Sequence, residues 1–494
     1  MDSHPLAGLT GRRPGSILGR VERPATRGAE PQGARPLEHA FLTAPPRPGR
    51  SEARVTATLL HPDVERATPD ALAPLQERLW QDQWRYVRTR SSFYRTKLGV
   101  AAARELTLDG LRELPLTDKE EIRASQETTP PYGDYLACAP EQVVRIHRTS
   151  GTTGRSLTIG FSQRDVEVVT RLGGRAMFCA GARPGLRIVH CLNYQLWTGG
   201  VTDHMIIEAS GATVVPFGVG QTRKLLETIG ELAVTGIHCT PSYPALLEKV
   251  LREEMGREPR SLGLQLGLFG GEAGLDHAAF RSRLEATWGF KVRNANFGLS
   301  EVMSILGSQC EHTNDLHYHA TDGVFAELLD PRSGERLPIR EGTTGELVCT
   351  HLLKECQPLV RYRTRDVLTV TGTAPCPCGR ATWRFRVTGR TDDMFNVRGV
   401  NVFPTAVQRV VAEAADLVSG QFRIVLAGPE PYDRIPVRAE AAPGLPPERW
   451  REAAAELERR IRAALGASAT VTLLPFEALP RTEGKTRLVE RESS

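Results

Sequence analysis

The 494-residue sequence has no long apolar run, few aromatic residues and little net charge outside its first 54 positions. No stretch approaches the roughly 20 uninterrupted apolar residues of a membrane-spanning helix, and the N-terminus lacks the apolar core of a secretory signal. These absences predict a cytoplasmic protein without a membrane span. The nine cysteines are an odd number, and several stand singly in apolar runs, where a reduced thiol behaves as a small hydrophobic side chain. We therefore expect no disulfide framework.

The positive charge is concentrated at one end of the chain. Residues 1–54 hold nine arginines and no lysine against five acidic residues, while the net charge of the whole chain is +5. A nucleic-acid-binding protein would gather Lys and Arg in a patch on its folded part, and the absence of such a run argues against a nucleic-acid partner. Residues 1–56 are rich in Pro, Gly, Ala and Arg without an apolar period, which predicts a disordered tail. An organelle-targeting signal is the less favoured alternative, because the segment contains acidic residues and lacks an amphipathic stripe.

Short apolar runs alternate with helical stretches in the middle of the chain. The runs occupy residues 186–193, 212–218, 236–241, 264–271 and 291–298. This alternation predicts an α/β fold with parallel strands, and ligands of such sheets bind at the carboxyl ends of the strands. A helix is expected within residues 72–98, and antiparallel strands are expected at 323–330 and 344–352.

The pattern changes after Arg390. It predicts helices at 405–415 and 449–466 and strands at 422–428, 435–442 and 469–476, which together form a small α+β unit. The expected organisation is a disordered tail at 1–56, a large domain at 57–390 and a small C-terminal domain at 391–494.

Residues 148–158 interleave two glycines with six hydroxyl side chains. Gly151 and Gly154 allow backbone N–H groups to approach an anion closely, and Ser150, Thr152 and Thr153 add hydroxyl donors. The composition is compatible with a phosphate-binding loop and equally with a surface turn. The GxxxxGK[ST] spacing of a Walker motif is absent.

The order of five segments between about Leu75 and Val489 resembles the AMP-forming adenylating enzymes, and among them the phenylacetate-CoA ligase branch. RTSGTTGRS at 148–156 is similar to the family's ATP phosphate loop, with Arg155 and Ser156 in place of the usual Lys-Pro. NFGLSE at 296–301 resembles the segment whose aromatic residue packs on adenine or the acyl group and whose glutamate holds magnesium. The resemblance assigns these roles to Phe297 and Glu301, and places Ser300 and Glu272 among the nucleotide contacts.

Three further segments carry the resemblance. RYRTRD at 361–366 resembles the segment whose aspartate, here Asp366, binds both ribose hydroxyls, for which a carboxylate is a suitable acceptor. GRTDDM at 389–394 is similar to the hinge, which implies a ribose contact for Arg390 and a pivot at Asp392. LPRTEGKTR at 479–487 resembles the C-terminal loop that delivers a catalytic lysine, here Lys485.

The resemblance implies a large multilayer α/β domain, a small mobile C-terminal domain, and the use of ATP, Mg²⁺ and CoA. A carboxylate that attacks the α-phosphate brings two anions together, so the site needs cations and N–H donors. Magnesium on Glu301 and the ammonium of Lys485 would supply them. The small domain would then turn about Asp392 to admit the pantetheine of CoA.

The acyl pocket is implied by the resemblance at residues 193–200, 239–243 and 270–273. Its expected lining residues are Tyr194, Trp197, Tyr243 and Gly271. The rings of Trp197, Tyr243 and Phe297 form either a slot for a flat aromatic acid or part of the core. Residues 271–274 are Gly-Glu-Ala-Gly, where the branch has Ala-Glu-Pro-Trp, and this change leaves room for a polar or larger acid.

A second cluster of candidate residues is independent of ATP. Cys376-Pro-Cys378-Gly-Arg and the segment from Cys310 to His319 resemble a structural zinc knuckle of some members of this branch. The expected ligands are Cys310, His317, Cys376 and Cys378, which would form a closed tetrahedral Zn²⁺ site without an open catalytic position. His312 and His319 are alternates, and unliganded reduced cysteines are the competing interpretation.

The predicted function is ATP-dependent activation of a small aromatic acid as an acyl adenylate, followed by transfer to CoA. The changes at Arg155-Ser156 and at 271–274 motivate an alternative: an adenylating enzyme of secondary metabolism with a non-CoA acceptor, such as an amide synthetase or a diazotase that adenylates nitrite for an aromatic amine. A catalytically silent scaffold is a third hypothesis, which the presence of Glu301, Asp366 and Lys485 disfavours. A homodimer is expected from the resemblance.

Overall fold

The computed structural model describes residues 58–149, 156–272, 275, 278–428, 430–479 and 488–492. The expected tail at 1–56 lies outside these ranges, as do residues 150–155 of the hydroxyl-rich loop and Lys485. Within the described ranges, no helix combines the length and the apolar character needed to cross a bilayer.

A twelve-stranded sheet forms the large domain, in the order β11-β10-β12-β13-β14-β9-β8-β7-β6-β5-β3-β4. Five strands at one end pair in parallel. They are β3 (Arg187–His190), β4 (Thr213–Pro216), β5 (Gly236–Cys239), β6 (Leu266–Gly270) and β7 (Lys291–Leu299). Each lies within, or one residue beyond, one of the five apolar runs, so the predicted α/β class and the parallel strands are confirmed.

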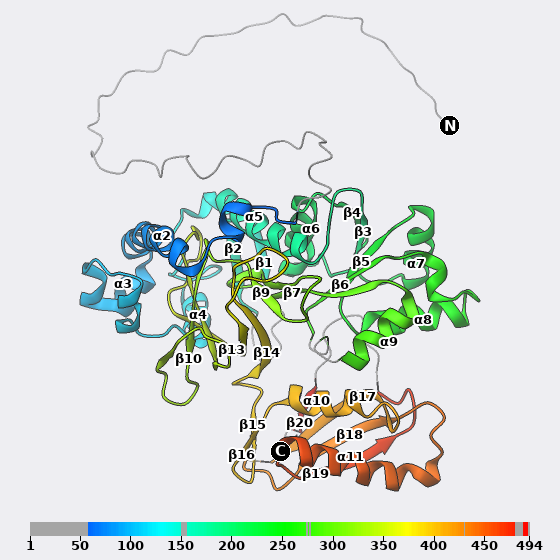
Figure 1. Ribbon diagram of the computed structural model, residues 1–494. Coiled ribbons are helices and arrows are strands. Elements are labelled where there is room, and N and C mark those ends of the chain that lie inside the picture. Colours follow the sequence, from blue (N-terminus) through cyan, green and yellow to red (C-terminus); the bar gives the residue numbers. More distant parts are fainter. Residues whose placement is uncertain are drawn as a thin grey trace, which may run out of the picture. The chain divides into compact units, whose positions relative to one another are not determined.

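The other strands of this sheet are antiparallel, and β7 is the strand at which the two parts meet (Figure 1). They are β8 (Met303–Gln309), β9 (Leu316–Tyr318), β10 (Val324–Leu329), β11 (Arg336–Leu337), β12 (Thr344–His351), β13 (Tyr362–Gly372) and β14 (Arg384–Arg390). The predicted antiparallel strands correspond to β10 and β12. The turn from β7 to β8 carries Ser300 and Glu301 at the carboxyl end of a parallel strand, where α/β sheets bind ligands.

Helices connect and cover the parallel strands. They are α5 (Gln163–Cys179), α6 (Thr198–Ala209), α7 (Thr222–Glu231), α8 (Tyr243–Glu253) and α9 (Ala278–Trp288), with a 3₁₀ turn at Pro259–Leu262. Ser162 caps α5, since its hydroxyl accepts from the backbone N–H of Asp165 while the Asp165 carboxylate accepts from the Ser162 N–H. A separate hairpin of β1 (Arg145–Arg148) and β2 (Thr158–Phe161) precedes α5 and flanks the hydroxyl-rich loop.

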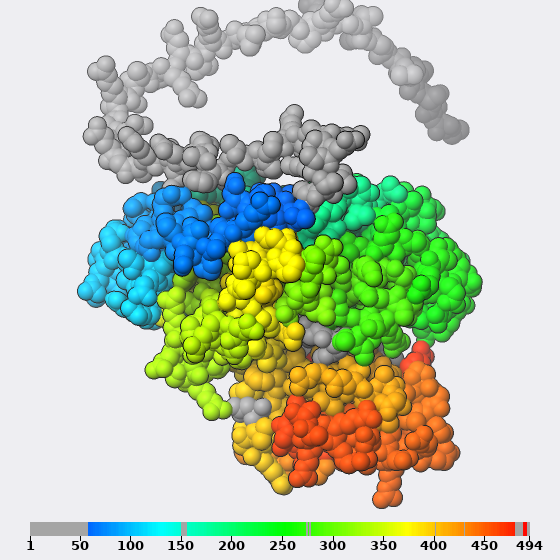
Figure 2. Space-filling view, in the orientation of Figure 1, coloured from blue at the N-terminus to red at the C-terminus, as the bar shows by residue number. Residues whose placement is uncertain are grey.

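The N-terminal part of the large domain is helical. It comprises α1 (Pro62–Glu65), α2 (Pro69–Arg90), α3 (Ser92–Leu98), α4 (Lys119–Thr128) and 3₁₀ turns at Gly99–Ala103, Asp109–Glu113 and Pro140–Gln142. The helix expected within 72–98 is divided at Ser91, whose backbone is extended and whose hydroxyl caps α3 by accepting from the Tyr94 N–H. Glu65 of α1 pairs with buried Arg380, and the blue atoms of this region adjoin the yellow atoms of the later chain in Figure 2.

The small C-terminal domain has its own sheets and core. A hairpin of β15 (Phe395–Val397) and β16 (Val400–Val402) comes first, followed by α10 (Pro404–Glu413). A four-stranded sheet follows, made of β17 (Val418–Ala427), β18 (Ile435–Ala441), β19 (Ala469–Leu474) and β20 (Val489–Glu492). Its strand order is β19-β18-β17-β20. A 3₁₀ turn at Pro447–Arg449 leads into α11 (Trp450–Leu465), which buries Ala453, Leu457 and Ile461. The two predicted helices and three predicted strands are confirmed, while β15, β16 and β20 were not predicted.

Candidate functional site

Glu301 lies in a nearly closed polar environment after β7. Its Oε1 atom accepts a hydrogen bond of 2.9 Å from the Lys119 ammonium and one of 2.7 Å from the Tyr362 hydroxyl, and 10% of its side chain is exposed. Burial alone raises the pKa of Glu301, but the charge and hydrogen bond of Lys119, together with the hydrogen bonds of Tyr362 and of the backbone, outweigh burial, so the pKa lies below its usual value. The carboxylate is therefore held ionised by two side chains from distant parts of the chain.

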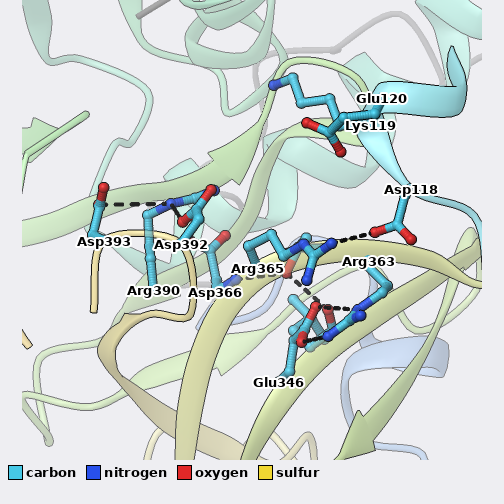
Figure 3. A network of polar contacts seen from close by, with 12 residues as sticks. Asp118, Lys119, Glu120, Glu346, Arg363, Arg365, Asp366, Arg390, Asp392 and Asp393 are labelled. Atoms are coloured by element: carbon cyan, nitrogen blue, oxygen red, sulfur yellow. Dashed lines mark hydrogen bonds and ion pairs between the residues drawn. The ribbon is translucent and has the colours of Figure 1, made fainter. Parts of the chain in front are cut away.

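The first turn of α4 holds Lys119 in this position. Asp118, the N-cap of α4, accepts a hydrogen bond from Arg365 on β13 (Figure 3). The backbone N–H of Asp118 donates to Glu121 at 2.8 Å. These contacts tie the helix terminus to the strand that also carries Tyr362. Lys119 is thus fixed by the fold and does not sit at the end of an unsupported side chain.

Asp366, Arg390 and Asp392 meet where β13 and β14 pair. Arg390 Nη1 donates to Asp366 at 2.7 Å, and Arg390 Nε and Nη2 donate to the two oxygens of Asp392 at 2.9 and 2.8 Å (Figure 3). Burial lowers the pKa of Arg390, but the carboxylates of Asp366, Asp392 and Asp393 outweigh burial and raise that pKa above its usual value. The two candidate ribose contacts and the candidate hinge residue therefore form one connected group. Arg390 is the last residue of β14, and Asp392 follows two positions later, before the hairpin of β15 and β16.

Two candidate pocket residues lie together at the carboxyl ends of the parallel strands. A Cβ atom on Gly271, which has φ +81°, would lie 3.7 Å from Cη2 of Trp197 and 3.9 Å from Cγ2 of Thr240. The adjacent Glu272 accepts a hydrogen bond of 3.2 Å from the Ser242 backbone N–H. Glycine at 271 therefore fits both the left-handed backbone and the close approach of the Trp197 ring.

The other candidate rings have separate surroundings. Tyr243 is 1% exposed and belongs to the core around β5 and α8. The Tyr194 hydroxyl lies 3.0 Å from Nδ1 of His204, and the Phe297 ring meets Phe385 edge-on with centroids 5.2 Å apart. The aromatic slot of Trp197, Tyr243 and Phe297 stays a prediction.

The candidate metal ligands come together as a buried cluster. One ligand atom from each of Cys310, His317, Cys376 and Cys378 lies within 4.8 Å of all the others. His317 Nε2 is 3.6 Å from Cys378 Sγ, while its Nδ1 faces the Thr382 hydroxyl at 3.3 Å. Three thiols and one imidazole nitrogen, with the second ring nitrogen occupied elsewhere, are a suitable donor set for tetrahedral zinc.

The two alternate histidines have other partners. His312 is 42% exposed and its Nε2 lies 3.5 Å from Glu311. His319 Nε2 lies 2.9 Å from the Ser308 hydroxyl. The geometry therefore favours His317 as the fourth ligand.

The hydroxyl-rich loop is described only at its two ends. Ser150, Gly151, Thr152, Thr153, Gly154 and Arg155 lie outside the described residues, and so does Lys485. At the base of the loop, the Thr149 N–H donates to the Leu157 carbonyl at 3.0 Å, and the Leu157 N–H donates to the Thr149 hydroxyl at 2.9 Å. These two bonds bring the ends of the loop together after β1 and before β2.

Comparison with known proteins assigns the chain to a family. Residues 95–351 match the family model described as AMP-binding enzyme, and residues 399–491 match the AMP-binding enzyme C-terminal domain. A phenylacetate-coenzyme A ligase of Thermus thermophilus is 33% identical over 446 residues, covering 86% of this chain and 97% of the relative. The chain belongs to the AMP-binding enzyme family. It is an AMP-forming ligase, as the order of its motifs predicted.

Two further relatives of this ligase are also CoA ligases by name. The phenylacetate-coenzyme A ligase of Escherichia coli K12 is 33% identical and covers 87% of this chain and 97% of the relative. A crystal structure of 2-hydroxyisobutyryl-CoA ligase in the postadenylation state, in complex with 2-HIB-AMP, has a TM-score of 0.81 at 26% identity, covering 88% of this chain and 93% of that chain. The adenylate-forming architecture expected from the sequence is thereby confirmed.

Lys119 and Tyr362 are site residues that the sequence analysis missed. Lys119 is 182 positions from Glu301, so no local motif joins them. One signal was present: Asp118-Lys-Glu-Glu121 has the spacing of a capping box, and a lysine in the first turn of a helix is disfavoured by the helix dipole. A lysine at such a position indicates a partner outside its own helix.

Proposed function

We propose that this ligase activates a small aromatic acid with ATP and transfers the acyl group to CoA. The observation that carries the proposal is the pairing of Glu301 with Lys119 close to the Asp366–Arg390 pair. Tyr362, which contacts Glu301, and Asp366 lie on the same strand, with Cα atoms at most about 14 Å apart. The ionised Glu301 carboxylate beside Lys119 suits the metal ion and the phosphates of a nucleoside triphosphate. The nearby Asp366 carboxylate suits the two hydroxyls of its ribose.

Each residue then has a defined task. Asp366 accepts hydrogen bonds from the ribose, and Arg390 orients that carboxylate. Glu301 provides the carboxylate for Mg²⁺, an ion that neutralises phosphate charge when bound. Lys485 and the loop 150–155 add the remaining cation and N–H donors by family resemblance. The acid carboxylate attacks the α-phosphate, pyrophosphate leaves, and the thiol of CoA then displaces AMP from the adenylate.

The aromatic substrate is the finer part of the proposal. The Trp197 ring beside Gly271 offers a flat apolar surface at the carboxyl ends of the strands, and the relatives at 33% identity are named for phenylacetate. The structural relative at TM-score 0.81 is named for an aliphatic hydroxy acid. A panel that contains both acid classes therefore tests this point.

The experiment measures pyrophosphate release from MgATP with phenylacetate, ring-substituted aryl acids and 2-hydroxyisobutyrate, each with and without CoA. Nitrite with an aromatic amine is tested in the same way. Mass spectrometry identifies the acyl product. We expect turnover with an aromatic acid and a thioester that forms only when CoA is present. Turnover that requires nitrite and an aromatic amine, with CoA irrelevant, would contradict the CoA acceptor.

We also propose that Cys310, His317, Cys376 and Cys378 hold one structural Zn²⁺. Elemental analysis of the purified chain is expected to find about one zinc per molecule, and Cys378→Ser is expected to lose it together with several degrees of thermal stability. Cys349→Ala removes a buried thiol elsewhere and is expected to retain the metal. Native protein free of zinc, with a melting temperature unchanged by chelators, would contradict the site.

We further propose that the ligase acts in the cytoplasm, where ATP is present and thiols stay reduced. All nine cysteines are free thiols in the structure, which supports this location. The expected homodimer stays a prediction, which light scattering of the purified chain would test.

A further inference from the structure

Two cysteines outside the ligase site and the metal cluster lie in direct contact. The Sγ atoms of Cys138 and Cys356 are 3.2 Å apart, although 218 positions separate the residues in sequence. The neighbouring Ala137 N–H donates to the Cys356 carbonyl at 2.7 Å, so the two backbone segments are also held together. A disulfide requires sulfur atoms about 2.05 Å apart. The pair would therefore need to close by roughly 1 Å.

The two thiols differ in accessibility and acidity. Cys138 is half-buried, whereas the other eight cysteines, Cys356 among them, are buried. The hydrogen bond with Cys356 lowers the pKa of the Cys138 thiol, against an opposing effect of burial. The same hydrogen bond, with burial, raises the pKa of Cys356. Redox-sensitive cysteines are accessible, have a lowered thiol pKa and lie beside a resolving cysteine. Cys138 is only half-buried, its pKa is lowered, and Cys356 lies beside it.

The geometry points to a reversible disulfide between Cys138 and Cys356 that forms under peroxide and alters ATP-dependent adenylation. Hydrogen peroxide oxidises the Cys138 thiol to a sulfenic acid and releases one water. The Cys356 sulfur then attacks the sulfenic sulfur, the S–S bond forms, and the hydroxyl leaves as a second water. Two thiols and one peroxide thus give one disulfide and two waters, and a dithiol reductant reverses the change.

The position of Cys356 explains why formation of the disulfide would affect the ligase site. The backbone N–H groups of Glu355 and Cys356 donate to the Asp165 carboxylate at 2.7 and 3.0 Å, at the start of α5. The next residue, Gln357, accepts from the Gly160 N–H on β2 at 2.7 Å. Strand β2 follows directly after the hydroxyl-rich loop. A shift of the segment that contains Cys356 would therefore be transmitted to β2, and through β2 to the hydroxyl-rich loop that precedes this strand.

Oxidation of the full-length chain tests the proposal. The reduced protein is treated with hydrogen peroxide, the remaining peroxide is removed with catalase, and free thiols are counted under denaturing conditions before peptide mapping. We expect the thiol count to fall by two, a single cross-linked peptide pair containing Cys138 and Cys356, and recovery with dithiothreitol. Cys138→Ala and Cys356→Ala are each expected to abolish the cross-link, whereas Cys349→Ala is expected to retain it. An unchanged thiol count, oxidation of Cys138 without a cross-link, or a thiol loss that persists in Cys138→Ala would overturn the proposal.

The effect on activity rests on the proposed function, but the cross-link does not. We expect acid-dependent pyrophosphate release to fall at least threefold on oxidation and to recover on reduction, and Cys138→Ala to be insensitive to peroxide. A cross-link that leaves this rate unchanged would overturn the regulatory role. If no acid supports pyrophosphate release in the reduced protein, the proposed function fails, while the thiol count and peptide map still decide the disulfide.

Discussion

Replacing Lys119 with methionine separates the ligase function of the Glu301 environment from its contribution to stability. The substitution keeps an unbranched apolar side chain and removes the ammonium that lies 2.9 Å from Glu301 Oε1. Glu301, with 10% of its side chain exposed, would then retain only the Tyr362 hydroxyl among its two described side-chain donors. The Glu301 carboxylate would then be held less firmly in position, and its pKa would rise because the charge of Lys119 no longer lowers it.

The expected magnitudes follow from burial. Breaking a fully buried ion pair costs about 3–5 kcal/mol, but Lys119 is 30% exposed, so solvent reduces the loss to about 1–2 kcal/mol of unfolding free energy. For MgATP we expect kcat/KM to fall about 10- to 100-fold, which corresponds to roughly 1.4–2.7 kcal/mol of transition-state stabilisation. Lys119→Arg keeps the charge and is expected to stay within about threefold of the parent.

The assay is acid-dependent pyrophosphate release as a function of ATP and Mg²⁺ concentration, with urea unfolding of the same proteins. Lys97→Met is the matched control, because Lys97 of α3 pairs at 2.5 Å with Glu121 of α4, the helix that carries Lys119. The described ion pairs and hydrogen bonds of Glu301 do not include Lys97. It is expected to lose stability and keep its Mg²⁺ dependence. Equal stability losses in Lys119→Met and Lys97→Met, with kcat/KM for MgATP unchanged in both, would refute the reasoning.

Two predictions concern buried charges. The buried Asp322 carboxylate pairs with Arg175 and, at 2.6 Å, with the less buried Arg171. Arg175→Met removes the more buried cation and is expected to lower the free energy of unfolding in urea by about 3–5 kcal/mol, whereas Arg171→Met should cost less. Burial raises the pKa of Asp203 to about 8, so between about pH 4 and 8 the folded state keeps a proton that the unfolded state has released, and stability falls by up to about 1.4 kcal/mol per pH unit. Asp203→Asn should remove this slope in unfolding measured from pH 6 to 8, and an unchanged slope would contradict the assignment.

The parallel half of the sheet was predictable chiefly because three of its strands, β3, β5 and β6, are largely buried. Strands β5 and β6 are buried along their whole length, and β3 is buried after its exposed first residue, Arg187. Strands covered on both faces are expected to be largely apolar, and here only Arg187, His190 and His238 interrupt the apolar residues of these three strands. The boundaries shifted by up to three residues, since an apolar run continues beyond the last ladder hydrogen bond. The division of the N-terminal helix at Ser91 was missed because a serine is also tolerated within a helix, and only its extended backbone identifies it as a cap.

The site was predictable where it is local. Asp366 and Arg390 come from two neighbouring strands and Asp392 follows Arg390 by two residues, and the resemblance already gave Asp366 and Arg390 a common ribose ligand. The four candidate metal ligands followed from the resemblance to a zinc knuckle. The structure shows what brings them together: β9, with His317, pairs with β14, which follows Cys376 and Cys378. Contacts such as Lys119 with Glu301 and Cys138 with Cys356 depend on tertiary packing over 182 and 218 positions, and no local pattern encodes them.

The formation of an acyl adenylate is the central claim, and isotope exchange between labelled pyrophosphate and ATP tests it most directly. The exchange is run with Mg²⁺ and the preferred acid, in the absence of CoA. The account predicts exchange that requires the acid and is lost in Asp366→Ala, with AMP as the nucleotide product once CoA is added. Exchange that is independent of every acid tested, or turnover that yields ADP and phosphate, would contradict it.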